Sequence, residues 1–386
     1  MLDISRVYCG NVTSSEELRY KKHSQLVPFH IQKKPIVVWN ITNSCNLTCE
    51  HCYANANEDL LKEELTTKEA KDVIDNLAAF KIPVILFSGG EPMMRDDILD
   101  LIAYTRFKRI RAVVSTNGVL IDKKRAEELK KCDISYVGIS IDGRKFVHDK
   151  FRGIDGAFEK TLNGIRNCVN AGIKVGLRFT IFKGNYREIP FLFDLMEMER
   201  IERICFYHLV CSGRGQSMKD SELSIEEKRN VMDLIIDKTK EFYNKNIKKE
   251  ILTVANHCDA VYLYKRMIKE NHPESEIAIN LLKLNKSASS GIGIASINWD
   301  GIVYPDQFWR NKPLGNIKTS SFEDIWLNPH NDFLVKLRNK KEFITGRCRR
   351  CNYFDICLGN FRPRAEELTG DVWASDPGCY LLDSEI

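Results

Sequence analysis

The chain has 386 residues, 43% hydrophobic and 29% charged, which is typical of a soluble globular protein with room for one large and one smaller domain. Its net charge of +5 is small, and basic residues alternate with acidic ones, so solvated helix faces explain them better than a nucleic-acid track. Neither a signal peptide nor an apolar run long enough for a transmembrane helix is evident. We therefore expect a cytoplasmic protein that binds neither nucleic acid nor membrane. In that compartment, 13 cysteines favour metal or redox chemistry over disulfides.

Short β-branched runs alternate with amphipathic stretches along the first two thirds of the chain. The predicted strands are 35–42, 84–90, 111–118, 135–143, 174–182 and 203–210. The predicted helices are 66–80, 95–107, 122–132, 156–172, 188–198 and 225–243. Six consecutive strand–helix units predict a parallel sheet with right-handed crossovers. We expect an α/β fold, a partial (β/α)6 barrel, with its functional site at the carboxyl ends of the strands.

The composition changes near residue 285, where a small-residue stretch, 285–293, resembles a domain boundary. After it we predict a hairpin at 294–308 with Asp300 and Gly301 in the turn, a short helix at 322–326 and a cysteine-rich end. The predicted organisation is an N-terminal extension, the partial barrel and a small C-terminal iron–sulfur domain. Their boundaries are 1–34, 35–284 and 285–386.

Cys45, Cys49 and Cys52 lie within eight residues in the loop after the first predicted strand. A structural zinc ion usually takes four ligands, and a thiol–disulfide motif needs only two cysteines. A [4Fe–4S] cluster normally takes one thiolate per iron, so three thiolates leave one iron open for a substrate or cofactor. The spacing therefore favours such a cluster over a fourth ligand from His51 or chance clustering of buried cysteines.

A second cysteine motif lies near the C-terminus, Cys348-x2-Cys351-x5-Cys357 followed by Cys379. Four thiolates describe a closed site, which is either zinc or a fully ligated iron–sulfur cluster. The spacing alone does not distinguish the two. The other six cysteines lack ligand spacing, and core packing explains those on predicted helices.

The first motif, with Tyr53 directly after its last cysteine, resembles the signature of radical S-adenosylmethionine (SAM) enzymes. The resemblance implies a [4Fe–4S] cluster whose open iron chelates the amino and carboxylate groups of SAM. It also implies that one electron cleaves SAM to a 5′-deoxyadenosyl radical, which abstracts hydrogen from the substrate.

The ends of the next four strands carry residues that match SAM-binding positions of that family. The resemblance assigns the SAM amino group to "SGGEP", the ribose or carboxylate to "STNG", the ribose to Ser140 and the carboxylate to the fifth strand. The residues so implied are Gly89, Gly90, Glu91, Ser115, Asn117, Ser140 and Arg178, with Thr116 and Asp142 as further options. The structural alternatives are an ordinary turn for the glycines, a cap for Asn117 and a surface ion pair for Arg178.

The C-terminal motif resembles the auxiliary-cluster domain of many radical SAM enzymes, called SPASM in its full form and twitch when reduced. The full form carries further cysteines around the hairpin, where this chain has Ala295 or Ser296 and Asp306. We therefore expect one auxiliary [4Fe–4S] cluster and two clusters in all, with Asp306 as a non-thiolate ligand the alternative.

Stretches along the whole chain resemble radical SAM proteins that modify sirohaem-derived tetrapyrroles. They include "ISRVYCG" (4–10), "LRYKKHS" (18–24), "YPDQFWR" and "GDVWASDPGCYL". One branch removes two acetate side chains from didecarboxysirohaem to give iron-coproporphyrin III, and it resembles this chain more. The other belongs to haem d-one biosynthesis and exchanges propionates for oxo groups on the same substrate.

Two other classes are weaker alternatives. A peptide-modifying maturase should carry an N-terminal winged-helix domain, for which residues 1–34 are too few. An iron–sulfur electron-transfer or scaffold protein would not need the SAM-type loops.

The branch implies a substrate with several carboxylates and an electron donor such as ferredoxin or flavodoxin. The basic residues expected to meet the carboxylates are Arg152, Arg178, Arg214 and Arg310. The predicted catalytic residues are Tyr207 and His208, which end the sixth strand, and His257, which follows a strand-like run at 250–256 and is expected to face the cavity. Packed strand ends and loops are the alternative for all three.

Overall fold

The computed structural model describes residues 1–11, 20, 33–58, 63–285 and 290–386. Most of the stretch 18–24 and four residues of the predicted boundary 285–293 lie outside this described part. Among the described residues, none of the helices combines the length and apolar character needed to cross a bilayer.

The described strands form one sheet of eleven strands in the order β1-β8-β7-β6-β5-β4-β3-β2-β9-β10-β11. They are β1 (Leu2–Asp3), β2 (Ile36–Thr42), β3 (Val84–Gly89), β4 (Arg111–Thr116), β5 (Tyr136–Ser140), β6 (Val175–Ile181), β7 (Arg203–His208), β8 (Glu250–Val254), β9 (Ile294–Ile297), β10 (Ile302–Tyr304) and β11 (Gly315–Asn316). Every neighbouring pair from β2 to β8 is parallel. This confirms the predicted α/β partial barrel and the six strand–helix units, and the strand-like run at 250–256 becomes β8.

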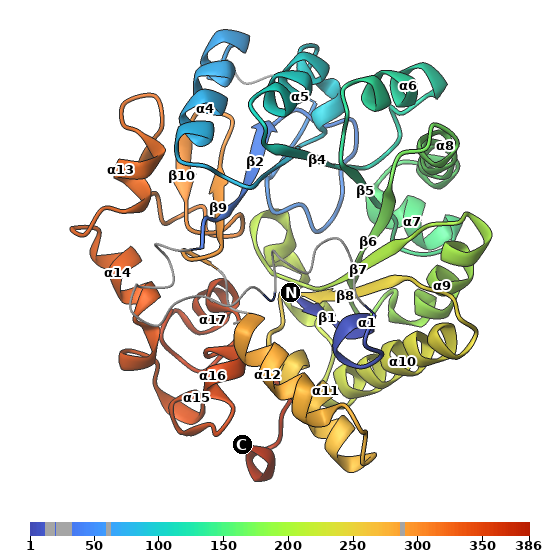
Figure 1. Cartoon of the computed structure of the whole chain (residues 1–386), viewed down its shortest axis with the longest axis vertical. Helices are drawn as coiled ribbons and strands as arrows, with labels where there is room; N and C mark the ends of the chain where they lie inside the picture. The colour runs from blue at the N-terminus through green and yellow to red at the C-terminus, as the bar shows by residue number, and fades with distance from the viewer. Residues whose placement is uncertain (12–19, 21–32, 59–62, 286–289) are drawn as a thin grey trace.

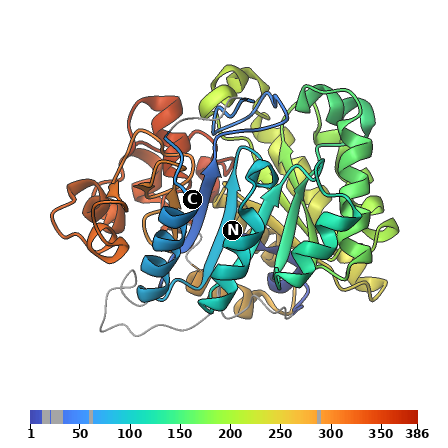
Figure 2. The same cartoon turned by 90° about the horizontal axis from the view of Figure 1, so that it is seen from above.

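Helices follow the strands and cover the outer face of the sheet (Figures 1 and 2). In the barrel they are α4 (Thr67–Ala79), α5 (Ile98–Phe107), α6 (Lys123–Lys131), α7 (Lys145–Arg152), α8 (Ala157–Asn170), α9 (Ile189–Met198), α10 (Ile225–Asn244), α11 (Cys258–Lys269) and α12 (Ser275–Asn285). Thr66 and Glu69 form a capping box at the start of α4, which fixes where this helix begins. Sequence analysis missed α7, whose two turns are too short and polar for a clear apolar period.

The core lies between the sheet and these helices. Trp39 of β2 and Phe87 of β3 are fully buried, and their rings stack at 5.9 Å. Phe193 of α9 packs on Phe206 of β7 at 5.8 Å. Alternate strand residues therefore point outward into the helix layer, and the intervening ones point into the barrel.

Both ends of the sheet are extended by segments from outside the predicted barrel. β1 pairs antiparallel with β8, beside the short helix α1 (Ile4–Val7). At the other end β9 pairs parallel with β2, and β10 continues the predicted hairpin, with Gly301 in its turn at φ +86°. Figure 1 shows this hairpin, in orange, beside β2. The sheet therefore runs without a break from the barrel into the C-terminal part of the chain.

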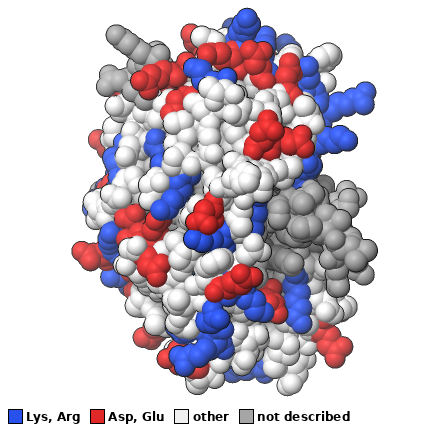
Figure 3. Space-filling model, turned by 90° about the vertical axis from the view of Figure 1, so that its left-hand side faces the viewer, with Lys and Arg blue, Asp and Glu red and all other residues white. Residues whose placement is uncertain are grey.

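The C-terminal part, residues 290–386, is called the tail below. After the hairpin it consists of short helices, drawn in red in Figure 1. They are α13 (Phe322–Trp326), α14 (Asp332–Arg338), α15 (Gly346–Arg350), α16 (Phe354–Cys357) and α17 (Arg362–Thr369). On the face shown in Figure 3, acidic and basic side chains are interspersed, which agrees with the expectation of solvated helix faces.

Candidate active site

Cys45, Cys49 and Cys52 lie in the loop after β2, residues 43–58, which is called the cysteine loop. The three thiols share one small apolar cluster, and Cys45 and Cys49 are each 8% exposed. Burial raises the pKa of the Cys45 thiol to about 12. A cationic group bound at the loop is therefore needed to hold these cysteines as thiolates, and iron supplies such a charge.

The "SGGEP" segment packs directly against this loop. The amide of Gly90 donates to Thr42 O at 2.8 Å, and the amide of Glu91 donates to Ser44 O at 2.8 Å. A Cβ on Gly89 would lie 2.3 Å from Thr42 O, and one on Gly90 would lie 2.1 Å from Ser44 O. Both glycines are therefore required for the close approach of β3 to the cysteine loop, whatever they contact in SAM.

Glu91 joins the ends of β3 and β4. Its buried carboxylate accepts from the Thr116 hydroxyl at 2.7 Å, the Asn117 amide at 2.8 Å and the Met93 amide at 3.0 Å. Burial raises the pKa of Glu91, and these bonds oppose the shift. Asn117 in turn donates its side-chain amide to Asn46 of the cysteine loop at 2.8 Å. Glu91 and Asn117 therefore brace the site, and their contact with SAM stays a prediction.

Three of the four arginines predicted to meet substrate carboxylates hold the cysteine loop. Arg214 donates to Cys49 O at 3.0 Å and Ala56 O at 2.6 Å, and Arg310 donates to Ala54 O. Arg152 pairs with buried Asp142 at 2.6 Å and places Nη1 3.5 Å from Cys49 Sγ. These guanidinium groups hold the loop, while Arg152 also lines the cavity inside the barrel and Arg310 the wider cavity beside it. The substrate role of Arg152, Arg214 and Arg310 therefore stays a prediction. Sequence analysis did not predict that arginines would hold the cysteine loop in place.

Inside the barrel lies a cavity of about 110 Å³, called the barrel cavity. It is lined at the strand ends by Ser88, Ser115, Ser140, Arg178, Thr180, Tyr207 and His208, and from the cysteine loop by His51 and Tyr53. The structure thus brings five predicted site residues together around one space. No aspartate or glutamate is among the described residues that line it. This cavity therefore favours an anionic or hydroxyl-rich occupant.

Arg178 of β6 reaches into the barrel cavity without an acidic partner in the described part of the chain. Its Nη1 donates to the Tyr207 hydroxyl at 2.9 Å, while its buried Nε has no hydrogen-bond partner there. The surface ion pair considered from the sequence is thus not formed. A cation held inside a protein without a counterion is costly, so this arrangement points to an anion that binds beside Arg178.

His208 ends β7 and is connected to two buried residues behind it. Its Nε2 lies 3.0 Å from Asp259 Oδ2 of α11, and the Tyr380 hydroxyl donates to Asp259 Oδ1 at 2.7 Å. His208 is 5% exposed, and both partners are fully buried. The sequence shows His208 as a candidate but gives no sign of Asp259 and Tyr380, which lie 51 and 172 residues away from it in the chain.

His257 does not line the barrel cavity. Ala255 adopts φ +65° directly after β8, so the chain turns away and His257 becomes the residue before α11. Its ring packs edge-on against Phe361 of the tail at 5.8 Å, and burial together with nearby cations lowers its pKa well below the usual value. The prediction that His257 faces the cavity is therefore wrong in geometry, because the turn at Ala255 was not recognisable in the sequence.

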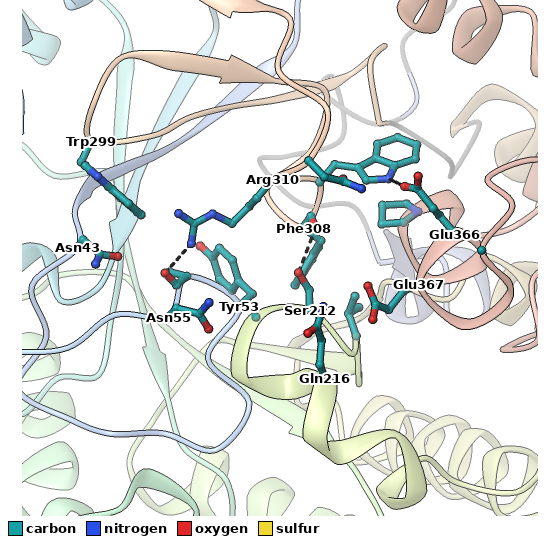
Figure 4. A pocket seen from close by; sticks show the side chains of 17 residues that line it. Asn43, Tyr53, Asn55, Ser212, Gln216, Trp299, Phe308, Arg310, Glu366 and Glu367 are labelled. Atoms are coloured by element: carbon teal, nitrogen blue, oxygen red, sulfur yellow. Dashed lines mark hydrogen bonds between the residues drawn. The ribbon is translucent and has the colours of Figure 1, made fainter. Parts of the chain in front are cut away.

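A second, wider cavity of about 700 Å³ opens between the cysteine loop, the segment after β7 and the tail (Figure 4). Its lining includes Trp299, Trp309 and Arg310 from the tail. It shares Tyr53, Val210 and Phe308 with the barrel cavity, so these residues separate the two spaces. Its size suits a large organic molecule, and the shared residues lie between such a molecule and the barrel interior.

The four tail cysteines are near neighbours, and their role as ligands of a closed site stays a prediction. Burial, together with the thiols of Cys351, Cys348 and Cys379, raises the pKa of Cys357 to about 12. The Tyr353 amide donates to Cys351 Sγ at 3.4 Å, and the amides two residues after Cys357 and Cys379 also bond to their sulfurs. Amide donors to sulfur are a means by which proteins tune iron–sulfur clusters, so this donor set fits one.

Two further residues, Cys258 and Asp306, bear on which side chains hold the metal site of the tail. Cys258, which has no ligand spacing in the sequence, lies beside Cys379 and is hydrogen-bonded to it. Asp306 accepts from the Ser290 hydroxyl at 2.7 Å and the Phe308 amide at 3.0 Å. Both oxygens of Asp306 are thus used in its own turn, so the alternative of an aspartate ligand is not supported.

Two family models match the chain. The Radical SAM superfamily matches residues 39–196, and the SPASM iron–sulfur cluster-binding domain matches residues 290–352. The chain is 50% identical to the Fe-coproporphyrin III synthase of Methanosarcina barkeri, a match that covers 100% of this chain and 99% of that protein. It is 38% identical to the pre-heme d1 synthase of Dinoroseobacter shibae over 91% of this chain and 87% of that one.

The fold is similar to that of Streptococcus suis SuiB bound to S-adenosylmethionine, with a TM-score of 0.71 at 16% identity. That match covers 90% of this chain and 78% of SuiB, and it supports the barrel and the tail architecture alone. The sequence match to Fe-coproporphyrin III synthase, by contrast, runs along the full length of both chains. The chain therefore belongs to the radical SAM superfamily, as an enzyme with a SPASM domain that is related to Fe-coproporphyrin III synthase.

Proposed function

We propose that this enzyme acts in haem biosynthesis and removes two acetate side chains from didecarboxysirohaem to give iron-coproporphyrin III. The observation that carries the proposal is the 50% identity to an Fe-coproporphyrin III synthase over essentially the whole of both chains. Arg178, which has no acidic partner among the described residues, supports a ligand with a carboxylate in the barrel, as SAM has.

In this proposal Cys45, Cys49 and Cys52 hold a [4Fe–4S] cluster that binds SAM. The cluster and SAM together supply a radical able to abstract hydrogen from an unactivated carbon. Gly89, Gly90 and Glu91 form the wall on the β3 side of the cysteine loop. The other residues proposed to bind SAM are Ser115, Asn117, Ser140 and Arg178.

The chain's own residues prepare this site before any ligand arrives. Arg152 sets a positive charge beside Cys49, and Asp142 balances that charge. Arg214 and the backbone of "SGGEP" fix the loop carbonyls. A preorganised loop lowers the cost of placing a reacting hydrogen within reach of the radical.

The tetrapyrrole is proposed to bind in the wide cavity and to extend one side chain past Tyr53 and Phe308. Trp299, Phe308 and Trp309 offer aromatic faces to a flat macrocycle. The side-chain carboxylate then meets Tyr207 and His208 at the barrel cavity, which is too small for the macrocycle itself. His208 lies on the same cavity and is proposed to be catalytic together with Tyr207.

The tail is proposed to hold an auxiliary [4Fe–4S] cluster through Cys348, Cys351, Cys357 and Cys379. The match to an iron–sulfur cluster-binding domain over residues 290–352 favours this assignment over zinc. Among the described residues, no group of three or more His, Cys, Asp or Glu side chains is arranged to hold a single metal ion. We further propose that the enzyme is cytoplasmic and receives electrons from a ferredoxin or flavodoxin.

The test is anaerobic reconstitution followed by measurement of iron and sulfide, then incubation with dithionite, SAM and didecarboxysirohaem. We expect about eight irons per chain, from two four-iron clusters. Mass spectrometry should show 5′-deoxyadenosine and a product that lacks two acetate units. About four irons with one zinc would overturn the auxiliary cluster, and absence of SAM cleavage with intact clusters would overturn the reaction.

The second candidate is the haem d-one branch, which the 38% identity to a pre-heme d1 synthase favours. The same assay distinguishes it, because loss of propionate instead of acetate would move the chain to that branch.

A further inference from the structure

The buried chain His208–Asp259–Tyr380 ends at the barrel cavity. Asp259 is fully buried, and its only basic partner among the described residues is the imidazole of His208. Its second oxygen accepts from the phenol of Tyr380. A carboxylate without a solvent contact must take all its hydrogen bonds from the protein, so these two donors define its environment.

The directions of the hydrogen bonds fix which ring nitrogen of His208 presents a proton to Asp259. The Tyr380 phenol is protonated at neutral pH and donates to Oδ1. The ionised Asp259 only accepts, so His208 must present Nε2–H to Oδ2. Nδ1 of the neutral ring then carries the lone pair. Among the described residues this nitrogen has no hydrogen-bond partner, and His208 lines the barrel cavity.

We propose that His208 Nδ1 exchanges a proton with a carboxyl group of the bound tetrapyrrole, and that Asp259, oriented by Tyr380, is the positioning residue that sets its tautomer. This inference rests on the proposed function. In the transfer an O–H bond of the substrate carboxyl group breaks and an N–H bond forms at Nδ1, or the reverse, and Asp259 balances the charge of the imidazolium.

The positioning pair also connects the barrel to the auxiliary site. Asp259 directly follows Cys258, and Tyr380 directly follows the predicted ligand Cys379, which contacts Cys258. The residues that orient His208 are therefore carried by two segments that meet at the tail cysteines. A correctly assembled tail is thus a condition for the correct tautomer at the cavity.

Asp259→Asn tests the proposal because it reverses one hydrogen bond. Tyr380 still donates to the amide oxygen, so the NH2 group faces His208 Nε2 and donates to it. The ring proton moves to Nδ1, and the cavity loses its base. With the reconstituted holoenzyme we expect the product to form about 10²–10⁴-fold more slowly, while SAM cleavage and iron content stay unchanged.

The double variant Asp259→Asn with Tyr380→Phe is the rescue. Without the phenol, the amide is free to turn and present its oxygen to Nε2–H, which restores the original tautomer. We expect product formation to recover about tenfold or more relative to Asp259→Asn. ¹⁵N NMR of histidine-labelled holoenzyme, with His208→Gln to assign the signal, should report Nε2–H in the wild type and double variant and Nδ1–H in Asp259→Asn.

Tyr262 and Asp233 supply the matched control. Their phenol–carboxylate bond of 2.9 Å joins α11 to α10 without touching His208. Tyr262→Phe and Asp233→Asn should change neither the His208 signal nor product formation. If Asp259→Asn does not fold, Tyr380→Phe is the test. This variant keeps the Asp259 carboxylate, so His208 should keep the Nε2–H tautomer, and an Nδ1–H signal would contradict the inference.

Three outcomes overturn the inference: wild-type product formation in Asp259→Asn, an Nδ1–H tautomer in the wild type, or a restored tautomer without recovery of product. Failure of the wild type itself to release acetate would count against the proposed function instead. The tautomer measurement remains a separate test in that case.

Discussion

The two cysteine sites differ in what surrounds them. Residues of the cysteine loop, His51 and Tyr53, line the barrel cavity, and Tyr53 also lines the wide cavity. None of the tail cysteines or their immediate neighbours lines either space. Three thiols beside a cavity and four thiols away from one are the arrangements expected of an open site that binds a ligand and a closed site that does not.

The two sites are also held differently. Side chains from distant segments, including Arg152 and Arg214, hold the cysteine loop. In the tail, the amides that reach the sulfurs belong to residues only two positions further along the chain. The open site therefore depends on the assembled barrel, whereas the closed site combines local turns with contacts from Ser375 and from Cys258 of α11.

The largest expected effect comes from removing one ligand at each site. Cys49→Ala should abolish SAM cleavage, because it removes a thiolate from the cluster that binds SAM. Cys351→Ala should retain 5′-deoxyadenosine formation but lose product. Each variant should lose up to about four irons. If Cys351→Ala also lost SAM cleavage while keeping its barrel cluster, the division between the sites would be wrong.

Arg178→Gln tests whether the barrel cavity beside the open site binds a carboxylate. Loss of a charged hydrogen bond to a carboxylate should lower product formation about 10²-fold. The ligand-free protein should gain about 1 kcal/mol in free energy of unfolding, because an unpaired interior cation is removed. Steady-state assays and chemical denaturation measure the two effects. Arg166→Gln, which breaks only the surface pair with Glu199, is the control and should leave activity unchanged.

Gly89→Ala tests whether the barrel braces the cysteine loop through backbone contact. The new Cβ meets Thr42 O at a backbone φ of +130°, so we expect a loss of about 3 kcal/mol in free energy of unfolding. Gly156→Ala has a similarly unfavourable φ of +79° but open space, and should lose only about 1 kcal/mol. Equal losses, measured by denaturation, would mean that the close approach contributes nothing.

Asp306→Asn has the smallest expected effect and separates structure from ligation in the tail. Burial raises the Asp306 pKa to about 6, above its value in the unfolded chain. The folded state therefore binds more protons between roughly pH 4 and 6, so wild-type stability should fall by about 1–3 kcal/mol as the pH rises through this range. That fall should be absent in Asp306→Asn. Iron content should not change; a loss of iron would restore Asp306 as a ligand.

The sequence was sufficient for the barrel because its strands and helices have clear periods and short connections. The cysteine spacing likewise predicted which thiols gather, since each motif lies within a few residues. Ser115, Ser140, Arg178, Tyr207 and His208 share one cavity because parallel strands end at the same edge.

Contacts between residues far apart in the chain could not be predicted from the sequence. The positive φ of Ala255, which directs His257 away from the cavity, belongs to a residue type that seldom adopts it. The bond from Arg214 to Cys49 O spans 165 residues, and that from Tyr380 to Asp259 spans 121. One sequence carries no periodic signal for such pairs, so arginines that brace the cysteine loop resembled substrate ligands.

The parallel pairing of β2 with β9 has a consequence for how a substrate enters. Val37 and Val38 pair with Ala295 and Ser296, so the strand that leads into the cysteine loop shares its backbone hydrogen bonds with the tail. The tail cannot swing away from the barrel without breaking this ladder. In the proposed binding mode, a substrate side chain therefore reaches the barrel cavity past Tyr53 and Phe308 while the ladder between β2 and β9 keeps the barrel and the tail together.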